Sequence, residues 1–278
     1  KLPAIAKKSS LSFWYYMAKP AFTATVKLKT ILFSLIAVVT LAALLLAVYF
    51  TGAYAVFYGG TNRRIPIYSV EREDKYISIT FDCAWGTEHT DAILQALSDY
   101  NVKATFFMVE FWTEKYSSYV ERIYEAGHSI GTHSKTHSYM SKLSADEIRA
   151  ELACSSAAIT AVTGAPVELF RAPYGDYDNE LIKTAEEEGY YTIQWDVDSL
   201  DWKDLPAGEI SMRVINRVQS GSIILMHNNG LHTAEAVPVI LKELISRGYT
   251  FVPVDQLIYR DNYYIDSNGR QQPAEQAA

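Results

Sequence analysis

The sequence predicts an α/β protein, a distorted (β/α) barrel with parallel strands, preceded by one transmembrane helix. From residue 76 onward, strand-like and helix-like runs alternate along the chain. Repeated strand, helix, strand units build parallel sheets, and their number over about 185 residues suits a barrel better than a small open sheet. Ahead of them, residues 31–50 form an apolar run without a charged residue.

The strand-like runs are short and rich in β-branched or aromatic residues, and most helical runs end at a glycine. We expect strands at 77–81, 103–109, 128–134, 167–173, 191–198, 222–228 and 249–254. We expect helices at 90–100, 119–126, 145–163, 179–188, shortly before Gly221, and at 233–246. The barrel domain is thus placed at 75–262, and the polar residues 263–278 are expected to be a disordered tail.

The N-terminal part divides into a basic cytoplasmic segment (1–30), a transmembrane helix (31–50) and a linker (51–74). The apolar run is long enough to cross about 30 Å of hydrocarbon. Six lysines precede it, so the positive-inside rule predicts a single-pass protein of the cell membrane, with its large domain outside the cytoplasm. A cleaved signal peptide is the alternative, because Ala53-Tyr54-Ala55 resembles a cleavage site. The long basic region and long apolar core favour a retained anchor.

The charge is unevenly spread along the chain. Residues 1–70 carry +8 and the whole chain −7, which leaves −15 for residues 71–278. So acidic a domain is not expected to bind nucleic acid. The two cysteines, Cys83 and Cys154, provide no disulfide framework, although a single bridge between them remains open.

Residues with reactive side chains follow the strand-like runs: Asp82, His133, Arg171, Asp198, Asp201 and His227. In a parallel barrel these strand ends converge on one face. His133 and His137 are four residues apart, which on one helical turn would place both imidazoles on one side, a spacing used to bind divalent metals. Each of these residues also has an ordinary interpretation when taken singly. Arg171 is typical of a surface ion pair and Asp201 of a solvated acid. His227 is typical of a hydrogen-bonded histidine at the end of a strand.

Five segments, "TFDCAWG", "HSKTHS", "RAPYG", "DSLDW" and "LMHN", resemble in order and spacing the motifs of the polysaccharide deacetylase family, the NodB-homology domain of carbohydrate esterase family 4. The resemblance covers about residues 75–259. Trp85 and Gly86 after the first motif are similar to its membrane-anchored, sporulation-type branch. The resemblance implies the NodB-type barrel and metal-dependent de-N-acetylation of a cell-envelope polysaccharide by a monomer. Peptidoglycan amino sugars are the leading substrate, ahead of chitin-like oligomers and acetylated xylan.

The resemblance also implies a role for each motif residue. Asp82 would be the general base, oriented by Arg171, and His227 the general acid, its pKa raised by Asp201. His133 and His137 would bind a divalent metal, with zinc favoured.

Three further residues would contact the substrate. The backbone N–H of Tyr174 would stabilise the oxyanion. Trp202 and Leu225 would form the walls around the acetyl methyl group.

Cys83 is the main departure from the family, which has a second aspartate at this position as the third metal ligand. A Cys83 thiolate could bind zinc instead, or the position could contribute nothing. Three hypotheses follow: an active metal-dependent deacetylase, a degenerate member that binds glycan without turnover, and a cysteine hydrolase with Cys83 as nucleophile.

Overall fold

The computed structural model describes residues 11–50 and 63–274, which divide into two compact units, Lys1–Arg63 and Arg64–Ala278. In the first unit, α1 (Leu11–Phe50) is one continuous helix. It begins twenty residues before the predicted span and so takes in most of the segment predicted to be basic and cytoplasmic. Within the described residues it is the one helix long and apolar enough to span a membrane, over Lys29–Ala47 with a mean hydropathy of 2.7. Both an anchor and a signal sequence have these properties.

The second unit is built on a parallel sheet of eight strands. Seven strands lie in the order β6-β5-β4-β3-β2-β8-β7, and β9 also pairs with β2. Their bounds are β2 (Tyr76–Cys83), β3 (Thr105–Met108), β4 (Ser129–Thr132), β5 (Leu169–Phe170), β6 (Tyr191–Thr192), β7 (Val197–Asp198), β8 (Ile223–His227) and β9 (Thr250–Phe251). The long strand predicted at 191–198 is therefore two short strands at opposite ends of the sheet.

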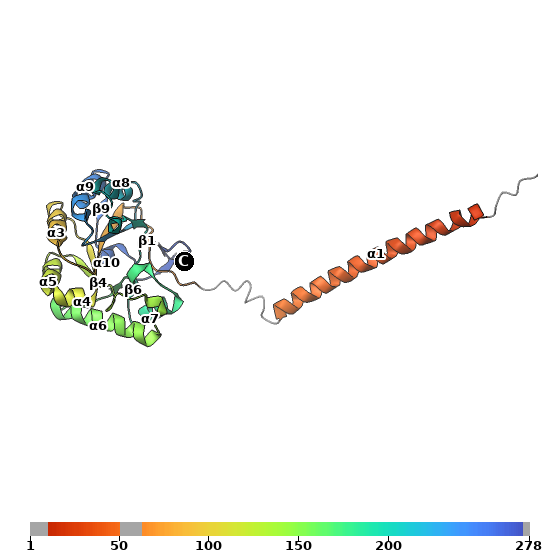
Figure 1. The fold of residues 1–278 in the computed structure, drawn as a ribbon, viewed down its shortest axis with the longest axis horizontal. Helices are drawn as coiled ribbons and strands as arrows, with labels where there is room; N and C mark the ends of the chain where they lie inside the picture. The colour runs from red at the N-terminus through yellow and green to blue at the C-terminus, as the bar shows by residue number, and fades with distance from the viewer. Residues whose placement is uncertain (1–10, 51–62, 275–278) are drawn as a thin grey trace, which may run out of the picture. The chain divides into compact units, whose positions relative to one another are not determined.

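Helices surround these strands in Figure 1. They are α3 (Thr90–Asp99), α4 (Glu110–Lys115), α5 (Ser117–Glu125), α6 (Ala145–Thr163), α7 (Asn179–Glu187), α8 (Ala207–Ile215) and α9 (Thr233–Ser246), with the short α10 (Val254–Leu257). The predicted helices are all present, and α4 and α10 were not expected. In α6, Ser144 forms a capping box with Glu147, and Gly164 ends the helix in the left-handed conformation.

The barrel is distorted because β6 and β7 do not pair with each other. Residues 193–196 connect them, and the segment before β2 lies along this gap: Ile67 bridges Ile193, and Ser69 bridges Ser222. The predicted fold class, a distorted barrel of the NodB type, is confirmed.

Strand β2 shows how the sequence divides the two sides of the sheet. Ile77, Ile79, Phe81 and Cys83 belong to the large apolar cluster that includes residues of α3 and α9. Ser78, Thr80 and Asp82 alternate with them and are buried among polar partners on the barrel side. Since side chains of a strand point alternately to opposite faces, Asp82 and its neighbour Cys83 lie in different environments.

Two boundaries predicted from the sequence are wrong. The second unit begins at Arg64 rather than 75, and residues 263–274 are ordered. A small sheet in the order β1-β11-β10 joins these two segments, with β1 (Ser69–Val70), β10 (Tyr263–Ile265) and β11 (Arg270–Pro273).

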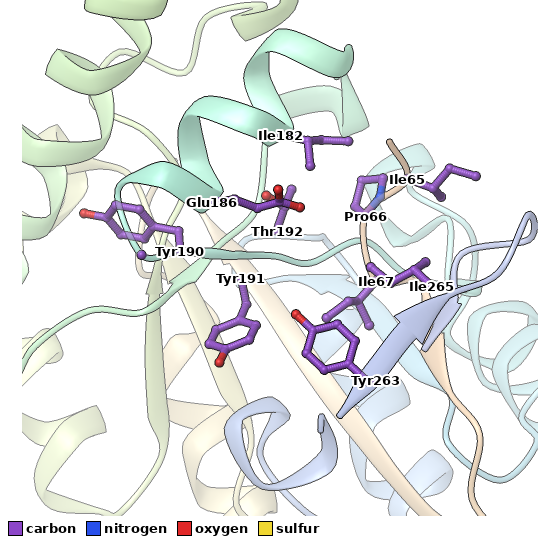
Figure 2. Close-up of a pocket in the computed structure, with 11 residues that line it drawn as sticks. Ile65, Pro66, Ile67, Ile182, Glu186, Tyr190, Tyr191, Thr192, Tyr263 and Ile265 are labelled. Atoms are coloured by element: carbon purple, nitrogen blue, oxygen red, sulfur yellow. The ribbon is translucent and has the colours of Figure 1, made fainter. Parts of the chain in front are cut away.

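The physical reason is apolar burial, which the polar composition of both segments conceals. Figure 2 shows Ile65, Pro66 and Ile67 facing Tyr263 and Ile265 around a cavity of about 260 Å³, which α7 and β6 also line. The rest of the predicted linker (51–62) and tail (275–278), like residues 1–10, lies outside the described residues.

Candidate active site

A cavity of about 590 Å³ opens at the carboxyl ends of the strands. The residues singled out from the sequence that line it are Asp82, His133, His137, Tyr174, Asp198, Trp202, Leu225 and His227. Arg171 and Asp201 are fully buried and reach the cavity through their partners Asp82 and His227. Arg171 is therefore not part of a surface ion pair, and Asp201 is not solvated.

Asp82 and Arg171 form a buried ion pair. The Nη1 of Arg171 donates to Asp82 Oδ1 at 2.8 Å and to Thr80 Oγ1 at 2.7 Å, and its Nη2 donates to the carbonyl of Gln194. Burial alone would raise the pKa of Asp82. The charge and hydrogen bond of Arg171, together with the charges of His133 and His227, outweigh burial and hold that pKa below its usual value. Asp82 therefore stays ionised and keeps a fixed orientation.

The backbone partner of His133 sets the tautomer of its ring, and burial keeps the ring neutral. Its Nδ1 lies 2.8 Å from the carbonyl oxygen of Arg171, an acceptor, so Nδ1 carries the proton and Nε2 keeps a free lone pair. Nε2 lies 3.5 Å from Asp82 Oδ2. Burial lowers the pKa of His133, which the Asp82 carboxylate only partly offsets. A neutral imidazole with one nitrogen already bonded is the form that binds a metal.

His137 lies close to His133, but not on a helix. Residues 133–137 form a loop, in which Ser134 and His137 have left-handed φ values of 72° and 57°. The predicted helical turn is therefore wrong, and the loop brings the two ring centroids to 5.1 Å by another route. The Nδ1 of His137 contacts the Tyr174 hydroxyl at 3.1 Å. Burial and the neighbouring His133 lower the pKa of His137 to about 4.

Glu151 of α6 holds this histidine loop, and sequence reasoning missed it. One carboxylate oxygen accepts the N–H groups of Lys135 and Thr136, each at 2.8 Å, and the other accepts the Thr136 hydroxyl at 2.8 Å. Glu151 is only 9% exposed although it lies within a helix. The only signal in the sequence is an acid at a position where helical periodicity expects an apolar residue.

His227 and Asp201 form the second charged pair. Asp201 Oδ1 lies 2.8 Å from His227 Nδ1, and Oδ2 accepts the backbone N–H of His227 at 2.8 Å and the Thr233 hydroxyl at 2.6 Å. Burial would lower the pKa of His227, but the hydrogen bond and charge of Asp201 raise it above its usual value. The register of β2 and β8 pairs Asp82 with His227, so the two charged pairs are neighbours in the sheet.

Tyr174, Trp202 and Leu225 line the same cavity. Tyr174 lies in the short helix η2 (Pro173–Gly175) with a φ of 61°, and Trp202 in η3 (Asp201–Lys203). Leu225 belongs to β8 and is buried, whereas the rings of Tyr174 and Trp202 are exposed.

Cys83 does not take part in the cavity. Its side chain is fully buried in the apolar cluster, and burial raises the pKa of the thiol well above its usual value. Both roles considered for it, zinc ligand and nucleophile, need an accessible thiolate. The structure contradicts both, because strand alternation turns Cys83 away from Asp82. Cys83 and Cys154 are free thiols, so the bridge left open by the sequence is not formed.

The two histidines fit a divalent ion as two of its ligands, since both rings face the cavity in a neutral form. Catalytic zinc sites usually have three protein ligands. Among the described residues, no group of three or more His, Cys, Asp or Glu side chains is arranged to hold a metal. Water would have to complete the coordination, and the ion would bind weakly.

Comparison with known proteins agrees with the fold. Residues 69–193 match the family model described as polysaccharide deacetylase. A peptidoglycan-N-acetylglucosamine deacetylase of Bacillus cereus is 33% identical over 196 residues, 69% of this chain and 92% of the relative. Another of that name, from Listeria monocytogenes, is 34% identical over 70% of this chain, which spans only 41% of the relative.

A solved structure described as a carbohydrate esterase family 4 pseudoenzyme from Bacillus anthracis also resembles this chain. It is 34% identical, with a TM-score of 0.67 over 69% of this chain and 68% of that one. A mutant of that pseudoenzyme is described as having restored enzymatic activity. The fold is an α/β distorted barrel, with the charged pairs Asp82–Arg171 and His227–Asp201 at one cavity. The chain belongs to the polysaccharide deacetylase family.

Proposed function

We propose that this protein hydrolyses the acetamide of peptidoglycan-type amino sugars, releasing acetate and leaving a free amine. One observation supports the proposal most: two charged pairs, Asp82 with Arg171 and His227 with Asp201, meet at a single cavity. Asp82 and His227 lie on the adjacent strands β2 and β8. One pair keeps a carboxylate ionised and the other favours a protonated imidazole. Hydrolysis of an amide needs such a base and such an acid together.

Asp82 is the base in this proposal. It accepts a proton from the water that attacks the acetamide carbonyl carbon, while Arg171 keeps the carboxylate in place. A group whose pKa is low accepts protons weakly, so a nearby positive charge that increases the acidity of the water is part of the chemistry. A divalent ion held by His133 and His137 would supply that charge and polarise the carbonyl.

His227 is the acid. Its Nδ1 is bonded to Asp201, so Nε2 is the nitrogen left to donate a proton to the departing amine as the C–N bond breaks. The backbone N–H of Tyr174 is proposed to stabilise the oxyanion, with Trp202 and Leu225 around the acetyl methyl group. All these residues come from one chain, in keeping with a monomer.

The apolar helix supports a location at the membrane. We propose that α1 anchors the protein in the cell membrane as a single span, with the domain on the extracytoplasmic side where peptidoglycan is found. The sporulation-type assignment rests on Trp85 and Gly86 alone and stays a prediction.

The test is acetate release from purified peptidoglycan by the full chain in detergent, with zinc and with a chelator. We expect zinc-dependent release that is lost in Asp82→Asn, which keeps the shape of the side chain but cannot accept the proton. Equal release by Asp82→Asn would exclude Asp82 as the base. A signal in the wild type that zinc and chelator leave unchanged would exclude the metal.

Cys83 in the apolar layer favours a second function, glycan binding without turnover. The missing third ligand weakens the metal site while the cavity and its walls remain. The similar Bacillus anthracis structure described as a pseudoenzyme supports this alternative. Binding of peptidoglycan with no acetate release at saturating zinc would establish it.

A further inference from the structure

The loop between β2 and α3, residues 84–89, contributes to the wall of the active-site cavity. Ala84 and Trp85 line the cavity, although the ring of Trp85 is 58% exposed. Gly86 has a φ of 54°, a left-handed conformation that favours glycine. Residues far away in the sequence hold this loop in place.

The carbonyl oxygen of Gly86 accepts two hydrogen bonds from buried side chains. Trp112 of α4 donates from Nε1 at 2.8 Å, and Asn228, which follows β8, donates from Nδ2 at 2.9 Å. The Nδ2 of Asn228 also donates to the Thr90 hydroxyl at 3.2 Å, at the start of α3. All three partners are fully buried. A carbonyl oxygen has two lone pairs, so both are used and the loop is fixed at Gly86.

The amide of Asn228 is incompletely hydrogen-bonded. Its Oδ1 is buried and has no hydrogen-bond partner among the described residues. An unsatisfied buried acceptor destabilises a fold, and an apolar residue of similar size would avoid this. What an apolar side chain could not provide is the donor to the Gly86 carbonyl.

The helix α4 also contacts the histidine loop. The N–H of Glu110 donates to the carbonyl of Ser134 in that loop at 3.1 Å. Phe111 packs against the ring of Trp85, with the ring centroids 5.3 Å apart. Glu110, Phe111 and Trp112 are consecutive, so one turn of α4 holds both loops next to each other.

His137 depends on neighbouring rings for its orientation. Whereas the ring of His133 bonds to the backbone carbonyl of Arg171, that of His137 contacts the Tyr174 hydroxyl at 3.1 Å. The rings of Trp85 and Tyr174 meet His137 edge to face, with centroid distances of 6.0 Å and 4.7 Å. A displacement of Trp85 would remove one of these two supports.

We propose that Trp112 and Asn228 are positioning residues of the active site. By holding the Gly86 carbonyl, they keep Trp85 against His137 and so fix the direction of this imidazole. Neither Trp112 nor Asn228 lines the cavity, so both act through other residues. The proposal rests on the proposed function for the role of His137 as a metal ligand. The placement of the ring itself does not require a bound metal.

The experiment uses the full chain in detergent and the variant Trp112→Phe, which keeps an aromatic ring in the core and removes the N–H donor. NMR resonances of the His137 ring measure its position relative to Trp85, because the ring current of an indole shifts nearby protons. We expect these resonances to shift in Trp112→Phe and in Asn228→Leu, which removes the other donor. Zinc affinity, measured by calorimetry, should fall about tenfold in both variants, a typical effect of removing support behind a metal ligand.

The Trp85→Ala background shows whether Trp112 acts through Trp85. In this background, Trp112→Phe should cause no further shift of the His137 resonances. Tyr190→Phe is the matched control, because it removes a hydroxyl that bonds to Ser156 at 2.7 Å, and neither residue lines the active-site cavity. It should leave the His137 resonances and the zinc affinity unchanged.

Unchanged His137 resonances in the folded Trp112→Phe and Asn228→Leu variants would overturn the proposal. An equal shift with and without the Trp85 ring would overturn it as well, because Trp112 would then act by another route. A parent protein that binds no zinc but shows these shifts would count against the proposed metal site and leave this inference standing.

Discussion

Replacing Asp201 by asparagine tests the electrostatic origin of the acid in the site. Asp201 is fully buried and contacts His227 Nδ1 at 2.8 Å. Asparagine keeps the shape and an acceptor oxygen but removes the negative charge that raises the pKa of His227. A hydrogen bond to a charged group contributes about 1.5–3 kcal/mol. We therefore expect the pKa of His227 to fall in Asp201→Asn, because the protonated ring loses this stabilisation and the neutral ring does not.

The direction of the change in activity follows from the role of His227. A general acid must be protonated, so activity declines as the pH rises through its pKa, and Asp201→Asn should move this alkaline decline to lower pH. The folded protein should respond in the same direction. Because folding raises the pKa of His227, the pair stabilises the fold below the unfolded pKa, and this contribution is lost as the pH rises through the folded pKa. The Asp201→Asn variant should not show this pH-dependent loss of stability.

Two measurements check the prediction. NMR titration of the His227 ring measures its pKa without requiring turnover, and the pH profile of kcat measures its consequence. Asp198→Asn is the control, because Asp198 also raises the pKa of His227 by its charge but is not hydrogen-bonded to the ring. It should produce a smaller shift. An unchanged His227 pKa in a folded Asp201→Asn variant would refute the electrostatic argument.

Three other predictions follow from the described contacts. Glu151→Gln removes a charge that accepts three hydrogen bonds. It should weaken zinc binding about tenfold, because the histidine loop becomes less well fixed. Unchanged zinc affinity in calorimetry would show that the loop keeps its conformation without this charge. Cys83→Ser should lower the free energy of unfolding by about 1–3 kcal/mol, because it buries a hydroxyl in an apolar layer. Zinc affinity should stay unchanged. A loss of zinc affinity would show that Cys83 belongs to the metal site. A chain starting at residue 64 should be soluble and folded. A chain starting at residue 71 lacks Ile67 and β1 and should melt several degrees lower. Equal melting temperatures would show that residues 64–70 add no stability.

The alternation of strands and helices was readable from the sequence because buried parallel strands and amphipathic helices have different periods. The same reading placed Asp82 and His227 at strand ends, and the register of β2 and β8 makes them neighbours. The fold could therefore be predicted, and so could the group of residues around the cavity.

What the sequence concealed depended on contacts between distant segments. The left-handed residues Ser134 and His137 give no local signal of a loop, because a four-residue spacing also fits a helix. Tyr263 and Ile265 stand among polar residues, and their order depends on the distant Ile67 and on the small sheet that includes β1. Glu151 stands at a position where an apolar residue is expected, but the sequence does not show that its partner is the loop at residues 135 and 136.

Arg171 joins two functions through different parts of one residue. Its guanidinium binds Asp82 and its carbonyl oxygen accepts from His133, each at 2.8 Å. Asp82 lies on β2 and His133 follows β4, so one residue after β5 connects the carboxylate and the imidazole of two other strands. The spacing of this pair therefore depends on the position of a single arginine, whereas His137 is placed by a separate loop that Glu151 holds.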